Sequence, residues 1–68
     1  MEWDKIQANW QHYKAFAKAR WARLGGDQLD AIGGQRGELV RSIQKVYGIT
    51  SGAAQMQLES WQGQQRDP

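Results

Sequence analysis

The fold is decided by residues 3–24, which read WDKIQANWQHYKAFAKARWARL. Aromatic and aliphatic residues recur in this stretch three or four positions apart. At about 100° per residue, this spacing places them within about 80° of one another on an α-helix. The stretch therefore predicts one long helix, from about residue 4 to residue 24, with a single apolar stripe. The stripe consists of Trp3, Ile6, Trp10, Tyr13, Ala17, Trp21 and Leu24.

Helix start and stop signals surround this stretch. Asp4 suits the first turn, where free backbone N–H groups attract carboxylates, and Gly25 with Gly26 supplies the left-handed geometry that ends a helix. Asp27 follows at once and is expected to cap a short second helix, with Asp30 as the acidic arm of a capping box.

Glycines then punctuate the rest of the chain. Three of them within residues 33–37 disfavour helix and predict a turn or kink near residues 33–36. The helical period returns from residue 39, and Gly48 is expected to end that third helix. Thr50 or Ser51 caps a fourth helix, whose inward face is expected to be Ala54, Leu58 and Trp61. No segment alternates apolar and polar residues, so no strand is expected.

These elements predict an all-α fold: a compact four-helix domain in which the long first helix packs against two short helices and a C-terminal helix. Because the second helix is brief and the glycine turn is tight, we expect two helical hairpins that cross at a steep angle. Residues 1–62 are expected to form the single domain and residues 63–68 a frayed polar tail.

Composition excludes several classes of protein. The 68 residues include no Cys and one His, which removes disulfides and thiolate metal sites and leaves no second imidazole for zinc. We expect neither a metal nor a cofactor. The longest apolar run is Ala15-Phe16-Ala17, far below the roughly 20 residues that span a bilayer, and the chain starts with acids rather than a basic leader. The expectation is a cytoplasmic monomer without a membrane segment.

The net charge of +2 is unevenly distributed, because residues 5–26 contain five cations and no acid. Such a segment fits a polyanionic partner, since the cations can contact phosphates. It also fits a helix whose basic residues lie toward its C-terminal end and favourably oppose the helix dipole. The second explanation is preferred, because nucleic-acid-binding domains are usually more basic. The five cations are Lys5, Lys14, Lys18, Arg20 and Arg23.

Catalytic chemistry finds little support in the sequence. His12 is the only imidazole base, and its position lies roughly opposite the apolar stripe, where a side chain is normally solvated. Glu38 and Asp30 resemble a carboxylate pair, but Arg36 and Arg41 are nearer in sequence and are expected to form ordinary ion pairs with them. The protein is therefore predicted not to be an enzyme.

The sharpest functional pattern is Gly34-Gln35-Arg36-Gly37, which matches the GXXG loop that clamps phosphates in KH domains. KH domains require flanking strands that this chain lacks, and any tight helix junction also needs glycines. Arg36 is further expected to lay its stem on the core and to pair with Asp27 or Asp30. The candidate residues for phosphate or partner contact are Gly34, Gln35, Arg36, Gly37, Arg41, Lys45, Lys14 and Lys18.

Aromatic residues interleave with cations along the first helix, a pattern compatible with stacking on single-stranded nucleic acid. The spacing instead assigns Trp10, Tyr13 and Trp21 to the buried stripe. Phe16 sits at the edge of the stripe and is the aromatic residue expected to be exposed. Together with Arg20, it is a candidate contact for a partner protein.

A further set of residues, spread over about residues 1–60, matches a known pattern: Met1-Glu2-Trp3-Asp4, Ile6, Asn9-Trp10, Tyr13-Lys14, Trp21, Leu24, Asp27, Leu29, Ile32, Gly34-Gln35-Arg36, Leu39-Val40, Ile43-Gln44, Tyr47-Gly48-Ile49-Thr50 and Ala54. In these residues the chain resembles the CsbD-like family of small bacterial stress-response proteins. The resemblance implies a compact helical domain, raised abundance in general stress or stationary phase, and no assigned enzymatic chemistry. The chain departs from the family at Ala8, Ala15 and Arg41, where glycine is frequent, and in its Gln-rich segment after Ser51.

The leading functional hypothesis is a non-enzymatic bacterial stress-response protein that acts through its surface, as a hydrophilic protectant or a weak interaction module. The alternative is a nucleic-acid-binding protein that uses the turn from Gly33 to Gly37 and the basic first helix. The partner itself, whether nucleic acid or protein, is not specified by the sequence.

Overall fold

Five α-helices follow one another along residues 2–66, the range that the computed structural model describes. Within that range the protein is all-helical, as predicted. The fold contains one helix more than the four expected, because the first predicted helix is two helices. The five are α1 (Trp3–Ala8), α2 (Trp10–Arg20), α3 (Gly26–Ile32), α4 (Arg36–Tyr47) and α5 (Ser51–Gln64).

The apolar stripe predicted on residues 3–24 forms the centre of the core. Six of its seven residues are buried, and Trp3 is partly buried against them. The stripe packs against apolar residues of α3, α4 and α5, including the predicted inward face of α5. Those residues are Leu29, Ile32, Leu39, Val40, Ile43, Ala54, Leu58 and Trp61.

The four indoles form a continuous chain of ring contacts through this core. The Trp3 ring centroid lies 6.5 Å from that of Trp10 and 6.1 Å from that of Trp61, and Trp61 lies 5.5 Å from Trp21. Three of the indole N–H groups also donate hydrogen bonds to segments distant in sequence. Their acceptors are the Gly34 carbonyl (2.7 Å), the Leu29 carbonyl (2.9 Å) and the Gln57 side-chain oxygen (3.0 Å), for Trp3, Trp10 and Trp21 respectively.

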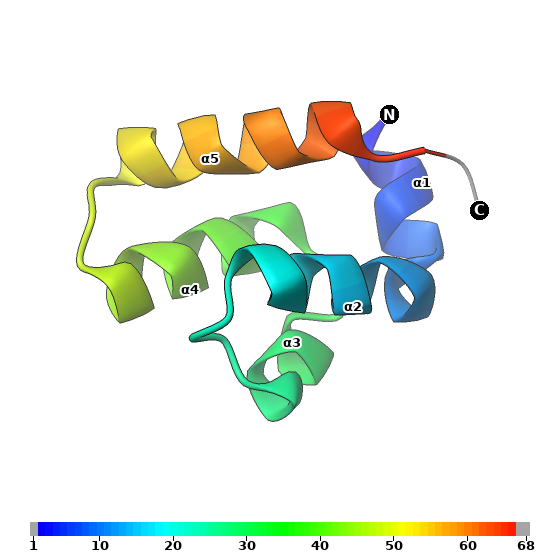
Figure 1. The fold of residues 1–68 in the computed structure, drawn as a ribbon, viewed down its shortest axis with the longest axis horizontal. Helices are drawn as coiled ribbons and strands as arrows, with labels where there is room; N and C mark the ends of the chain where they lie inside the picture. The colour runs from blue at the N-terminus through cyan, green and yellow to red at the C-terminus, as the bar shows by residue number, and fades with distance from the viewer. Residues whose placement is uncertain (1, 67–68) are drawn as a thin grey trace.

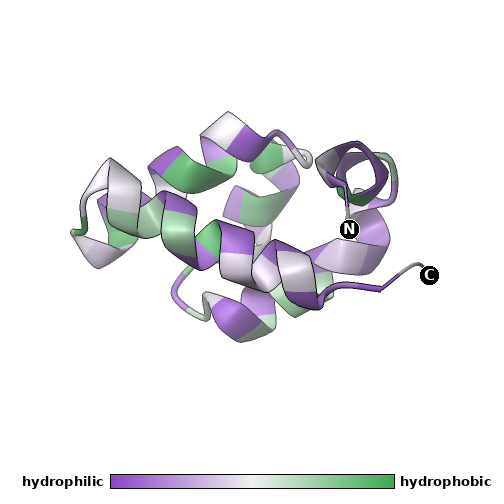
Figure 2. Ribbon diagram, turned by 90° about the horizontal axis from the view of Figure 1, so that it is seen from above, coloured by the Kyte–Doolittle hydropathy of each residue, from purple (hydrophilic) through white to green (hydrophobic). Residues whose placement is uncertain are grey.

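The prediction of one unbroken first helix was wrong at Asn9, where the backbone leaves helical geometry (φ −115°, ψ 35°). The Asn9 side-chain amide donates to the Lys5 carbonyl at 2.8 Å, and its backbone N–H is shared between the carbonyls of Lys5 and Ile6. Asparagine favours such local bonds over a regular helix. As a result, α1 lies at a steep angle to α2 (Figure 1), and it is seen almost end-on when the molecule is viewed from above (Figure 2).

The predicted end of the first helix was also wrong. α2 stops at Arg20, and Gly25 is extended (φ −71°, ψ 160°) rather than left-handed. The chain leaves the helix at Trp21, whose indole is bonded to Gln57 of α5. The neighbouring loop is bonded to α4, because the backbone N–H of Arg23 donates to the Tyr47 hydroxyl at 3.1 Å.

The cap of α3 differs from its prediction as well. The N-cap is Gly25 and not Asp27, which lies inside the first turn. The carboxamide oxygen of Gln28, not a carboxylate of Asp30, accepts from the Gly25 N–H at 3.0 Å. Gln28 therefore holds the start of α3 and leaves the Asp30 side chain available for another helix.

Later turn and cap predictions are confirmed. Gly33 (φ 60°) and Gly34 (φ 84°) form the turn between α3 and α4, and left-handed Gly48 (φ 63°) ends α4. The Thr50 hydroxyl accepts from the Ala53 N–H at 3.1 Å and caps α5.

α4 and α5 form an antiparallel hairpin, and α2 runs along the front of the molecule with α3 beneath it (Figure 1). The steep crossing of two hairpins stays a prediction. α5 extends to Gln64, and the carbonyl of Arg66 accepts a hydrogen bond from the Tyr13 hydroxyl. Of the tail predicted at 63–68, residues 67–68 lie outside the described range.

Replacing Trp10 by alanine tests whether the stripe is the core. The variant loses both ring packing and the bond to Leu29, so we expect its free energy of unfolding to fall by about 3–5 kcal/mol. The whole domain is expected to have only about 3–10 kcal/mol. Urea denaturation followed by far-UV circular dichroism measures the change. Phe16→Ala, which truncates an aromatic residue that is 49% exposed, is the control and should unfold close to the parent. Equal midpoints for Trp10→Ala and the parent would mean that the stripe is not the core.

Candidate functional site

The glycine turn that the sequence singled out is packed tightly against α1. Gly34 is buried, and a Cβ atom built on it would lie 3.0 Å from the Cα of Gln7. Its carbonyl accepts the Trp3 indole N–H, and the N–H of Gln35 donates to the Ile32 carbonyl at 3.0 Å. The close approach of two backbones therefore explains glycine at position 34 without a ligand.

Arg36 lies at the start of α4, but its predicted partner was wrong. Its Nη2 atom is 3.8 Å from a carboxylate oxygen of Glu59 on α5, and not beside Asp27 or Asp30. These two side chains line a shallow depression of about 400 Å³ together with Gln62 and Gly63. Asp30 instead pairs with Lys14.

Arg41 and Lys45 stand one turn apart on α4. Arg41 pairs with Glu38 at 3.7 Å, the ion pair that the sequence predicts. With Gln44, the two cations line a depression of about 260 Å³. Because the Arg41 side chain is 77% exposed, its ion pair contributes little to stability. This part of α4 presents cations to solvent without a carboxylate for Lys45 among residues 2–66.

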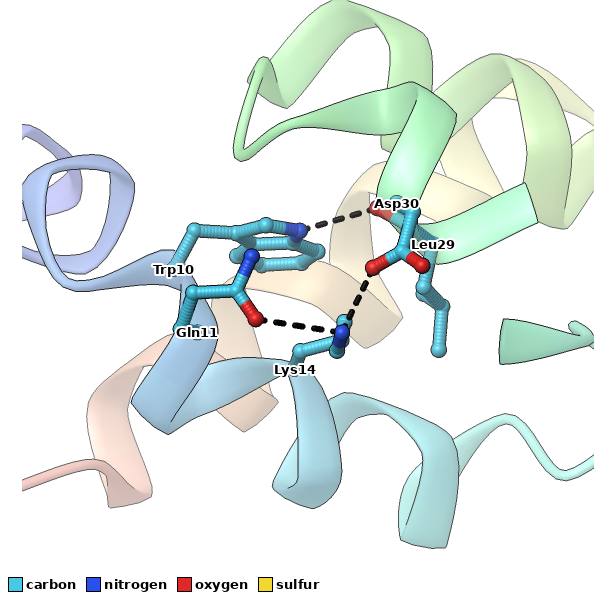
Figure 3. A network of polar contacts seen from close by, with 5 residues as sticks. All are labelled: Trp10, Gln11, Lys14, Leu29 and Asp30. Carbon is cyan, nitrogen blue, oxygen red and sulfur yellow. Dashed lines mark hydrogen bonds and ion pairs between the residues drawn. The ribbon is translucent and has the colours of Figure 1, made fainter. Parts of the chain in front are cut away.

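Lys14 belongs to a small network that joins α2 to α3 (Figure 3). Its ammonium group lies 2.5 Å from Asp30 Oδ1 and 3.2 Å from Gln11 Oε1. Beside it, the Trp10 indole donates to the Leu29 carbonyl. Lys14 is thus tied to the fold, whereas Lys18, one turn further along α2, is exposed. The structure does not gather the predicted site residues into one place: Lys14 contacts α3, Arg36 contacts α5 and Arg41 contacts its own helix.

Two of the five cations of residues 5–26 lie where α2 ends: Arg20 is its last residue, and Arg23 is in the loop that follows. The Arg20 guanidinium lies 5.4 Å from the Trp21 ring centroid, and that of Arg23 lies 5.8 Å from the Tyr47 ring centroid. Phe16 is exposed, as predicted. The absence of any acid in residues 5–26 pointed to both arginines, but only the structure shows that the Trp21 and Tyr47 rings hold them.

Groups that support catalysis are dispersed over the surface. His12 is exposed, and its ring lies 4.9 Å from the Tyr13 ring and 5.4 Å from the Phe16 ring. Within residues 2–66, no three His, Asp or Glu side chains are grouped so that they could hold a metal ion. None of the five described helices combines the length and apolar composition that crossing a bilayer requires.

Alanine substitutions at two glycines test whether the turn needs glycine at position 34 for its packing against α1. Gly34→Ala places a Cβ against the backbone of Gln7 at positive φ, so we expect a loss of about 1–3 kcal/mol of stability. Gly37→Ala is the matched control, because position 37 is helical with open space around it and should gain about 0.5–1 kcal/mol. Thermal denaturation of both variants measures the difference. A Gly34→Ala variant as stable as the parent would contradict the close contact with α1.

Arg36→Lys tests the nature of the pair with Glu59. One contact of 3.8 Å between partly exposed groups contributes little, so we expect the free energy of unfolding to change by less than about 0.5 kcal/mol. A larger loss in urea denaturation would indicate a bidentate pair that lysine cannot reproduce. Arg41→Lys provides the comparison at an exposed pair.

No family model and no solved structure matches the chain. Curated relatives do match it. A UPF0337 protein of Pectobacterium atrosepticum is 37% identical over 62 residues, which cover 91% of this chain and 90% of the relative. YjbJ, a UPF0337 protein of Escherichia coli K12, is 32% identical over 62 residues, with 91% and 90% covered. A UPF0337 protein of Rhodopseudomonas palustris is 31% identical over 61 residues, with 90% and 92% covered.

None of these relatives carries a name that states an activity. Their similarity extends over about nine-tenths of this chain and of each relative. The chain therefore belongs to the UPF0337 family, which is the CsbD-like family.

Proposed function

We propose that the protein is a non-enzymatic bacterial stress-response protein that acts through its surface as a hydrophilic protectant of other macromolecules. The stress association rests on the CsbD-like family. The proposal includes a cytoplasmic location and a monomeric state.

The observation that carries the protectant role is the distribution of amide side chains. The chain has ten glutamines and a mean hydropathy of −0.82, and every glutamine lies at the surface or partly exposed. Each amide can donate two hydrogen bonds and accept others. The surface thus offers neutral hydrogen-bonding groups that can take the place of water around a neighbouring protein during drying.

The composition of the interior also supports a role for the surface amides. Among residues 2–66, no polar or charged residue is buried, and no buried side-chain polar atom lacks a partner. The fold is held by apolar packing and by indole hydrogen bonds, one of which Gln57 accepts. The glutamine side chains lie exposed or partly exposed, where they can contact other molecules. The dispersed ionisable groups support a non-enzymatic role, because catalysis needs a base, a nucleophile and an orienting group within hydrogen-bond reach.

The second candidate is nucleic-acid binding through the turn from Gly33 to Gly37 and the basic α2. The observation in its favour is that Lys18, Arg20 and Arg23 have no carboxylate partner among the described residues. It predicts DNA or RNA affinity that falls steeply with salt and is reduced by Arg36→Ala. Absence of binding at low salt would exclude it.

Drying tests the protectant role. A drying-sensitive enzyme is dehydrated with the protein or with an equal mass of an ordinary globular protein, and its residual activity is measured after rehydration. We expect more activity with this protein, and equal residual activities would contradict the proposal.

A matched variant tests the role of the amides. Alanine at Gln11, Gln55 and Gln64, all exposed and helical, should leave the circular dichroism spectrum intact and reduce protection. If this variant protects as well as the parent, the amide groups are not the protecting feature.

A further inference from the structure

One side of α2 is not covered by any other helix and combines small and aromatic apolar side chains with two cations. We call it the α2 outer face and define it as Ala15, Phe16, Lys18, Ala19 and Arg20, all of which are exposed. Phe16, at 49% exposure, is one of two large apolar residues exposed within residues 2–66. At about 100° per residue, the two alanines and Phe16 lie side by side, and Lys18 and Arg20 flank them on opposite sides.

The cations of this face have no carboxylate partner among residues 2–66. No acid occurs in residues 5–26, and the ion pair of α2 takes Lys14 to Asp30 rather than Lys18 or Arg20. Arg20 is held over the Trp21 ring, and Arg23, in the adjoining loop, is held over the Tyr47 ring. Stacking restrains both guanidinium groups while their N–H edges stay available to an acceptor. The face is therefore complementary to a partner that brings negative charge.

The apolar residues in the middle of the face, Ala15, Ala19 and Phe16, favour a helix as the partner. Alanine side chains let a second helix approach closely, and an exposed phenylalanine beside arginine is typical of the residues that anchor protein interfaces. A nucleic-acid strand would gain from stacking on several exposed aromatic rings. Among the Phe, Tyr and Trp residues of the described range, only Phe16 is exposed, and the exposed His12 ring beside it is the one further ring on this side of α2. The net charge of +2 is also small for a nucleic-acid-binding domain.

We propose that the α2 outer face is a docking surface for an acidic amphipathic helix of a partner protein. The partner's apolar side chains would pack on Phe16, Ala15 and Ala19, and its carboxylates would pair with Lys18 and Arg20. This inference rests on the part of the proposed function in which the protein acts through its surface, and it is independent of protection during drying. A contact of one helix face belongs to the small, transient class of interfaces.

The experiment uses a fluorescein-labelled synthetic peptide of about three heptads, with leucine at the first and fourth positions and glutamate at the flanking positions. Glutamates at all flanking positions keep the peptide from pairing with itself, because like charges repel. Fluorescence anisotropy measures its binding to the whole protein, and circular dichroism measures the helix that forms on binding. A peptide with lysine in place of each glutamate is the charge control and should not bind.

Variants locate the contact. We expect Phe16→Ala, and separately the pair Lys18→Gln with Arg20→Gln, to weaken peptide binding about tenfold each. The charge variant should also lose most of the dependence of affinity on salt. Met56→Ala, which truncates the other exposed large apolar residue (72%), and Lys5→Gln, on α1, are matched controls expected to stay within about twofold of the parent.

Failure of the glutamate peptide to bind at low salt would overturn the inference, and so would equal losses of affinity in the control variants. Binding of oligothymidylate in place of the peptide would also overturn it, because the face would then be assigned to nucleic acid. Repeating the drying assay with Phe16→Ala keeps the two proposals distinguishable. If Phe16→Ala loses peptide binding but still protects the enzyme, the residue acts in the docking face alone. If the protein binds the peptide but does not protect the enzyme, only the protectant role is contradicted.

Discussion

Everything in this fold depends on hiding the indoles of the first segment from water. The stripe on residues 3–24 is buried by the remaining helices, and three of its indole N–H groups reach across to α3, α5 and the turn before α4. Each tryptophan thus supplies apolar area and also one directed bond that fixes the position of a second segment. A chain of 68 residues without cysteine has few other means of holding its helices together.

The apolar composition of the core determines which side chains lie on the surface. Because the interior contains only apolar residues and glycine in the described range, charged and amide side chains are left outside, where the three ion pairs join exposed or partly exposed groups. Such pairs do little for stability in water. The polar side chains consequently lie on the outside, which is why the proposed function is assigned to the surface.

Local signals in the sequence predicted some features well. Gly48 ends α4 and Thr50 caps α5 as expected, because a left-handed residue and a hydroxyl that accepts a nearby N–H act within a few residues. The burial of the stripe followed from periodicity, which depends only on spacing. The glycine turn was located correctly, and phosphate contact by its GXXG pattern stays a prediction. What the sequence did not indicate is the packing role of Gly34, whose carbonyl is bonded to Trp3 and whose added Cβ atom would meet Gln7 of α1.

By itself, therefore, the sequence determined that the protein is helical, which face of the first segment and of α5 is buried, and where α4 ends and α5 begins. Only the tertiary structure decided that the first segment bends at Asn9, that α2 stops at Trp21, and that Lys14 rather than Arg36 pairs with Asp30. The physical reason is distance along the chain. Periodicity and capping involve neighbours within about one turn, but the bend lets Trp3 meet Gly34, and the identity of an ion-pair partner depends on how helices far apart in sequence settle on the shared core.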